Sequence, residues 1–209
     1  MSSLSQEKNI VIESAGSFDR NELLYPDGSI LNESETKKVH LTHDNMNIFS
    51  KKSIFFQKRN SFIATGNVHV KQGDSINLFC DSLNYDGLTR KFSSYGSVKF
   101  INDKMELNSN VLFFDRDSNE IYFDKNGKII DSASTIKSKE GKYFINEKKY
   151  EFKENVIVEN PDYKIRSNMM DYFLNSEITL FYKFSTIITD DYTIFCNEGF
   201  YDPQKKIGV

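Results

Sequence analysis

The sequence predicts an all-β chain built from antiparallel two-strand repeats, and three observations carry this prediction. A short residue pattern recurs at a nearly constant spacing along the 209 residues. The chain holds 18 Phe and 11 Tyr, residues that suit half-buried pleated surfaces, whereas alanine, the best helix former, is rare. Turn-forming Asp, Asn, Gly and Pro interrupt each repeat twice, and no segment shows sustained helical spacing.

The recurring pattern is an aliphatic residue, a small residue two places on, and an aromatic residue five places after that. The small positions step by 30, 29, 29, 29 and 29 residues, a period typical of stacked repeats. The six copies are Ile48, Ser50, Phe55; Leu78, Cys80, Tyr85; Leu107, Ser109, Phe114; Ile136, Ser138, Tyr143; Ile165, Ser167, Tyr172; and Ile194, Cys196, Tyr201.

In chain order, residues 1–9 are expected to be a tail, and residues 10–207 to form one repeat domain. Residues 10–18 hold a degenerate copy of the pattern, residues 25–28 a turn and residues 32–38 a loop. Regular repeats then start near residues 39, 68, 98, 129, 156 and 187. Two turns in about 29 residues leave two strands of about ten residues, joined as antiparallel hairpins.

Each repeat also contains a break in strand parity. Leu78 and Cys80 are two residues apart, as are Leu83 and Tyr85, but Cys80 and Leu83 are three apart. In an unbroken strand the two pairs would face opposite sides. We therefore predict a bulge or bend near residues 81–82 and at the equivalent place in every repeat.

Stacking the repeats places a row of small residues between an aliphatic and an aromatic row. A close-packed core interdigitates large side chains, so a continuous small row favours an open trough. The alternative is that the small side chains only make room for facing residues, and the sequence does not decide between the two.

No enzyme motif is present, and we expect neither a cofactor nor a metal. His40 and His43 beside Asp44 fall on opposite faces of a strand, so we interpret them as solvated turn residues. The aspartates after the aromatic position (86, 115 and 202) and the pair 190–191 are explained by turns. Cys80 and Cys196 fill the small position of two distant repeats, so a disulfide between them is not expected.

Charge and hydropathy exclude other classes of function. The net charge is -3 and the lysines are spread along the chain, so no nucleic-acid surface is indicated. No apolar run reaches the length of a transmembrane segment, and residues 1–9 show no signal peptide; if the protein is exported, the signal has been removed.

The run Ala64–Val70, with its Gly-Asn-Val step, and the pattern from Leu78 to Asp86 resemble the OstA-like family. This family contains the lipopolysaccharide-transport protein LptA and related domains of LptC and of the amino terminus of LptD. Residues 194–202 resemble the form found in Bacteroidota. Residues 37–39 and 128–130 depart from the Gly-Asn-Val step.

The resemblance implies a twisted β-jelly roll whose two antiparallel sheets form an open V, with an apolar groove along it. It also implies a periplasmic, non-enzymatic carrier that binds the acyl chains of lipopolysaccharide or a similar lipid and joins other OstA-like domains, or copies of itself, by end-to-end strand addition. The residues expected to line the groove are Ile48, Phe55, Val68, Val70, Leu78, Cys80, Leu83, Tyr85, Val98, Phe100, Leu107, Leu112, Phe114, Ile136, Tyr143, Val156, Val158, Ile165, Met170, Tyr172, Ile194 and Tyr201.

Two other classes of function remain as alternatives. A structural or interaction scaffold would have the same repeats around a filled core. An enzyme on a β-repeat scaffold would need one unique cluster of Asp, Lys and Arg on one face, and the sequence shows only repeated ones.

Overall fold

The computed structural model describes residues 9–103, 105–131, 134–205 and 207–208. The predicted tail therefore lies, apart from residue 9, outside the described residues. The chain divides into two compact units, residues 1–103 (unit 1) and 104–209 (unit 2), which are described separately.

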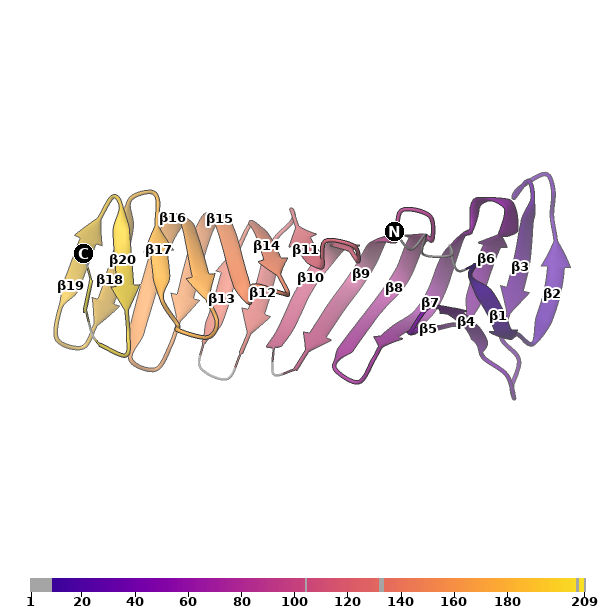
Figure 1. Cartoon of the computed structure of the whole chain (residues 1–209), viewed down its shortest axis with the longest axis horizontal. Helices are drawn as coiled ribbons and strands as arrows, with labels where there is room; N and C mark the ends of the chain where they lie inside the picture. Colours follow the sequence, from indigo (N-terminus) through magenta and orange to yellow (C-terminus); the bar gives the residue numbers. More distant parts are fainter. Residues whose placement is uncertain (1–8, 104, 132–133, 206, 209) are drawn as a thin grey trace, which may run out of the picture. The chain divides into compact units, whose positions relative to one another are not determined.

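Unit 1 is formed by β-strands and one short turn of 3-10 helix (Figure 1). Its elements are β1 (Val11–Ser14), β2 (Ser17–Arg20), β3 (Gly28–Asn32), β4 (Val39–His43), β5 (Met46–Ser50), β6 (Lys52–Phe56), η1 (Gln57–Arg59), β7 (Ser61–Gln72), β8 (Ile76–Asp86) and β9 (Lys91–Asn102).

These strands pair antiparallel in two layers. In layer A, β1 pairs with β4, β4 with β5, and β5 with the second half of β7. In layer B, β2 pairs with β3, β3 with β6, and β6 with the first half of β7. The long strands β7, β8 and β9 pair along both halves and so belong to both layers.

Unit 2 repeats this organisation. Its strands are β10 (Met105–Asp115), β11 (Glu120–Phe123), β12 (Gly127–Ile130), β13 (Thr135–Ser138), β14 (Glu140–Phe144), β15 (Lys149–Glu159), β16 (Tyr163–Phe173), β17 (Thr179–Phe181), β18 (Ser185–Thr189), β19 (Thr193–Cys196), β20 (Gly199–Asp202) and β21 (Ile207–Gly208). The predicted all-β antiparallel repeat fold is confirmed, and each unit is a two-layer β-jelly roll.

In layer A of unit 2 the order is β10, β12, β13, β15, β16, β18 and β19. In layer B it is β10, β11, β14, β15, β16, β17, β20 and β21. Again β10, β15 and β16 contribute to both layers, whereas the other predicted ten-residue strands are interrupted where the chain passes from one layer to the other.

The predicted break in parity occurs where a strand changes layer. Leu78, Cys80, Leu83 and Tyr85 are all buried, so both pairs face the interior. The extra residue of the bulge, however, lies on the neighbouring strands and not at residues 81–82.

On β7 the bulge falls at Gly66 and Asn67, with φ of 78° and 48°. Gly96 and Ser97 on β9 have φ of 72° and 44°, and residues 154–155 on β15 have φ of 59° and 55°. These positive values explain the Gly-Asn step, because Gly and Asn tolerate left-handed backbone best. In the fourth repeat, where the step is absent, Asn126 has φ of 58°.

The row of small residues lies at these layer changes, which we call corners. The hydroxyls of Ser109, Ser138 and Ser167 donate hydrogen bonds to the carbonyl oxygens two residues on, at 2.9, 2.9 and 3.2 Å. At the first corner, Ser50 Oγ lies 2.9 Å from Ser53 Oγ. At three of the six corners the small residue therefore forms a hydrogen bond with the bent backbone, a role that neither of the two sequence interpretations anticipated.

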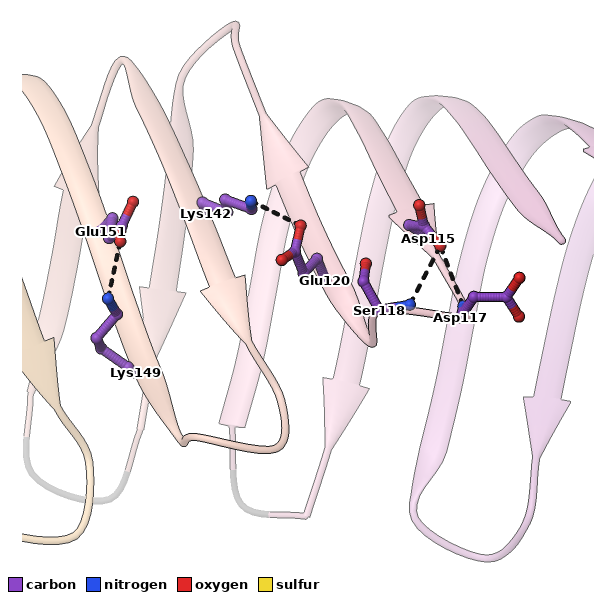
Figure 2. A network of polar contacts seen from close by, with 7 residues as sticks. All are labelled: Asp115, Asp117, Ser118, Glu120, Lys142, Lys149 and Glu151. Carbon is purple, nitrogen blue, oxygen red and sulfur yellow. Dashed lines mark hydrogen bonds and ion pairs between the residues drawn. The ribbon is translucent and has the colours of Figure 1, made fainter. Parts of the chain in front are cut away.

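The recurrent aspartates form turns, as predicted. Asp115 Oδ1 accepts hydrogen bonds from the backbone N–H of Asp117 and Ser118, at 3.0 and 3.3 Å (Figure 2). Asp86 and Asp202 accept from the N–H groups two and three residues on in the same way. These side chains satisfy backbone donors that the hairpin leaves open.

Candidate functional site

The candidate site is the space between the two layers of each unit. On layer A, aliphatic or aromatic side chains from neighbouring strands form one inward ladder of directly opposed residues. In unit 1 the ladder is Leu41, Ile48, Val70, Leu78 and Phe100. In unit 2 it is Leu107, Ile129, Ile136, Val158, Ile165, Ile187 and Ile194.

Layer B carries a second inward ladder that is mostly aromatic. In unit 1 it is Phe55, Phe62, Tyr85 and Phe92. In unit 2 it is Phe114, Ile121, Tyr143, Tyr150, Tyr172, Thr179 and Tyr201. The two ladders give each unit an interior that is apolar from strand to strand, except at Thr179 in unit 2.

The residues expected to line the groove all point into this interior, but they are packed and not open to solvent. Of the 22, only Ile194 is half-buried; the others are at most 7% exposed. The space between the layers is thus closed by side chains at these positions, and the opening of a lipid groove there remains a proposal.

Sequence reasoning missed part of both ladders, above all the layer B half of the long strands. Leu41, Ile129 and Ile187 of the layer A ladder, and Phe62, Phe92, Ile121, Tyr150 and Thr179 of the layer B ladder, were not selected. A regularity could have found the layer B set, since its positions 62, 92, 121, 150 and 179 also step by 30, 29, 29 and 29. The residue class varies more in this series, which hides the repeat.

The rim of unit 1, where turns of the two layers approach each other, is held by polar contacts. His43 at the end of β4 lies 2.6 Å from the hydroxyl of Tyr85 on layer B. Arg90, after β8, forms an ion pair of 2.5 Å with Asp44 in the β4–β5 turn. The interpretation of His43 as solvated was wrong: it is 3% exposed because it packs against Tyr85, whereas His40 lies on the outer face against Phe49.

The rim of unit 2 contains a cavity of about 430 Å³. It lies between turns of layer A, including Asp162 and Asp190, and layer B residues that include Glu177 and Tyr201. Burial raises the pKa of the Tyr201 hydroxyl to about 12, and the neighbouring hydroxyl of Tyr192 contributes to this rise. Because its lining carries several carboxylates, the cavity disfavours an anionic group at this place.

The outer face of layer B in unit 2 carries ion pairs, one between neighbouring strands β11 and β14 and one within β15. Lys142 pairs with Glu120 at 2.6 Å, and Lys149 with Glu151 at 2.8 Å (Figure 2). The Lys149 ammonium also lies 4.7 Å from the ring centroid of Phe144. Partly exposed pairs of this kind contribute little stability, so we assign them to the solvated face and not to a site.

Both cysteines are free thiols. Burial raises the pKa of the Cys80 thiol to about 12, and burial also raises the pKa of Cys196. A buried thiol of high pKa is unreactive, so no nucleophilic chemistry is indicated at Cys80, whereas Cys196 is only half-buried. The described part of the chain contains no helix long and apolar enough to cross a membrane.

Repeats that cross between two antiparallel layers around an apolar interior define a β-jelly-roll repeat protein. The chain belongs to the OstA-like protein family, whose model matches residues 7–168. The sequence resemblance to this family is thereby confirmed.

No protein of curated function matches the sequence. Among solved structures, the chain is similar to LptH, the LptA-homologous periplasmic component of the lipopolysaccharide transport device of Pseudomonas aeruginosa. The identity is 16%, the match covers 64% of this chain and 80% of that chain, and the TM-score is 0.28, which carries no argument about fold or function.

Proposed function

We propose that this chain is a periplasmic, non-enzymatic carrier of lipopolysaccharide or a similar acylated lipid, and that acyl chains lie between its two layers. Membership of the OstA-like family supports a role in lipopolysaccharide transport. The observation that carries the proposal is the pair of inward apolar ladders, since a long fatty chain needs an apolar surface that continues from strand to strand.

Binding would exchange one set of apolar contacts for another. Each acyl CH2 that leaves water contributes about 0.8 kcal/mol. Because the inward side chains already pack against each other, a lipid must separate the layers and replace those contacts. The net gain in binding free energy is therefore small for each added CH2. An acyl chain held in this way can move along the ladder because no position is a deep free-energy minimum.

Edge strands offer the means of joining partners. Among the described residues, β1 and β2 of unit 1 and β19 and β21 of unit 2 each pair along one side only. Edge strands with free backbone groups accept a further strand from another protein. We therefore propose that another OstA-like domain, or a second copy of this chain, pairs with these edges.

Neighbouring residues of β19 supply a test of the carrier function. Ile194 belongs to the inward ladder and is half-buried, whereas Phe195 points outward and is 67% exposed. A photo-reactive phenylalanine analogue at position 194 should cross-link to purified lipopolysaccharide, and unlabelled lipopolysaccharide should compete with the cross-link. The same analogue at position 195 is the matched control and should give little product.

The second candidate function is a structural or interaction scaffold, and the closed packing of the interior favours it. In that case no saturable binding of lipopolysaccharide occurs, and positions 194 and 195 cross-link equally or not at all. Specific, competable cross-linking at position 194 alone would exclude the filled scaffold.

A further inference from the structure

Three neighbouring strands of unit 2 place tyrosines side by side on the inward face of layer B. Tyr143 on β14, Tyr150 on β15 and Tyr172 on β16 are directly opposed in register. The ring centroids of Tyr143 and Tyr150 are 4.4 Å apart with planes 22° from parallel, and those of Tyr150 and Tyr172 are 6.4 Å apart. Stacking on both sides fixes the ring of Tyr150, and with it the direction of its hydroxyl.

The Tyr150 hydroxyl differs from its neighbours because it has no hydrogen-bond partner among the residues that the structure describes. The side chain is completely buried, and desolvation strongly raises its pKa. The hydroxyls of Tyr163 and Tyr172, by contrast, interact with the side chain of Ser134. A buried hydroxyl without a partner costs folding free energy, so its retention calls for a specific reason.

Charge indicates which acceptor this hydroxyl suits. The negative charge of the Asp131 carboxylate, in the layer A turn, interacts electrostatically with the hydroxyls of Tyr150, Tyr163 and Tyr172. The carboxylate of Glu177 does the same with Tyr163 and Tyr172. In each case the carboxylate raises the tyrosine pKa, which means that the local field is negative. A phosphate or carboxylate would be repelled there, whereas a neutral carbonyl oxygen can accept a hydrogen bond.

We propose that the Tyr150 hydroxyl donates a hydrogen bond to the carbonyl oxygen of an acyl ester or amide in the bound lipid. This inference rests on the proposed function, and it sets the depth at which an acyl chain lies. The carbonyl is held at the tyrosines, and the hydrocarbon continues along the layer B ladder, past the buried side chains of Ile121 and Phe114.

The test uses two uncharged lipids of the same length, 1-monomyristoylglycerol and its ether analogue 1-O-tetradecylglycerol, with the whole chain. Only the first has a carbonyl oxygen. The wild type should bind the ester about fivefold more tightly than the ether, the size of one net hydrogen bond. Tyr150→Phe should bind both equally, with unchanged affinity for the ether.

Two further measurements separate a binding role from a structural one. Tyr182→Phe removes an equivalent hydroxyl from the outer face, where it donates to Asp171 at 3.0 Å, and should keep the ester preference. Tyr150→Phe should be at least as stable to heat as the wild type, because it deletes an unpartnered polar group.

Equal binding of ester and ether by the wild type, an ester preference that survives Tyr150→Phe, or a lower thermal midpoint of that variant would each overturn the inference. If the wild type binds lipopolysaccharide but does not distinguish the two glycerol lipids, the inference alone fails. If it binds neither those lipids nor lipopolysaccharide, the proposed function fails as well.

Discussion

Replacing Gly96 by alanine tests the corner geometry directly. Gly96 has φ of 72°, and a Cβ added there would lie 2.3 Å from Asp81 Oδ2 and 2.9 Å from Asp81 Cβ. Gly73 is a matched control, since its φ is 58° but an added Cβ meets nothing within 4 Å. Gly73→Ala therefore incurs only left-handed strain, about 1–2 kcal/mol.

Gly96→Ala should cost the same strain plus overpacking of about 1–3 kcal/mol, for a total of about 2–5 kcal/mol. Urea unfolding of the wild type and both variants, followed by circular dichroism, measures the free energy of unfolding. A slope that is unchanged between variants shows that the same transition is being compared. Equal losses for Gly96→Ala and Gly73→Ala would refute the claim that close contact with Asp81 shapes this corner.

Three further predictions concern single positions. Gly141→Ala should lower the free energy of unfolding by about 1–3 kcal/mol, because the added Cβ would lie 2.4 Å from the buried ring of Phe123; combining it with Phe123→Leu should recover part of the loss, and additive losses would contradict this packing. In the folded protein an aromatic disulfide reagent at pH 8 should label Cys196 faster than Cys80, whose thiol is buried with a pKa of about 12; each cysteine-to-serine variant assigns the signal, and equal rates would show that the corner at Cys80 opens readily. Backbone N–H donors lower the pKa of Asp202, so its stabilisation is complete above the ordinary carboxyl pKa and is lost as pH falls through the lower folded value; Asp202→Asn should flatten stability against pH below about 4, and unchanged pH dependence would argue against a charged turn aspartate.

The repeat in the sequence was sufficient to predict the strands, their antiparallel pairing and the turn aspartates. These features depend on local chemistry: aromatic and β-branched residues favour pleated strands, and Asp or Gly favours tight turns. The break in parity between Cys80 and Leu83 likewise predicted that each strand changes direction. The inward direction of the 22 expected groove residues follows from the same two-residue period.

The location of the bulge could not be read from one strand alone, because it is a relation of register between two. Gly66 and Asn67 supply the extra residue while the parity break appears on β8, and only the pairing of the strands reveals which side carries it. The contact between His43 and Tyr85 similarly joins residues 42 apart in the chain. From the sequence alone, His43 was therefore interpreted as a solvated turn residue.

Local residue preference and a period of 29 to 30 residues therefore determine that this chain folds into layered hairpins with an apolar interior. Tertiary structure decided three other features: the hydrogen bonds made by the row of small residues, the closure of the interior by side chains, and the lack of a hydrogen-bond partner for the Tyr150 hydroxyl among the described residues. The physical reason is that packing and hydrogen-bond satisfaction depend on which strands face each other across the two layers, and a period along one strand does not contain that information.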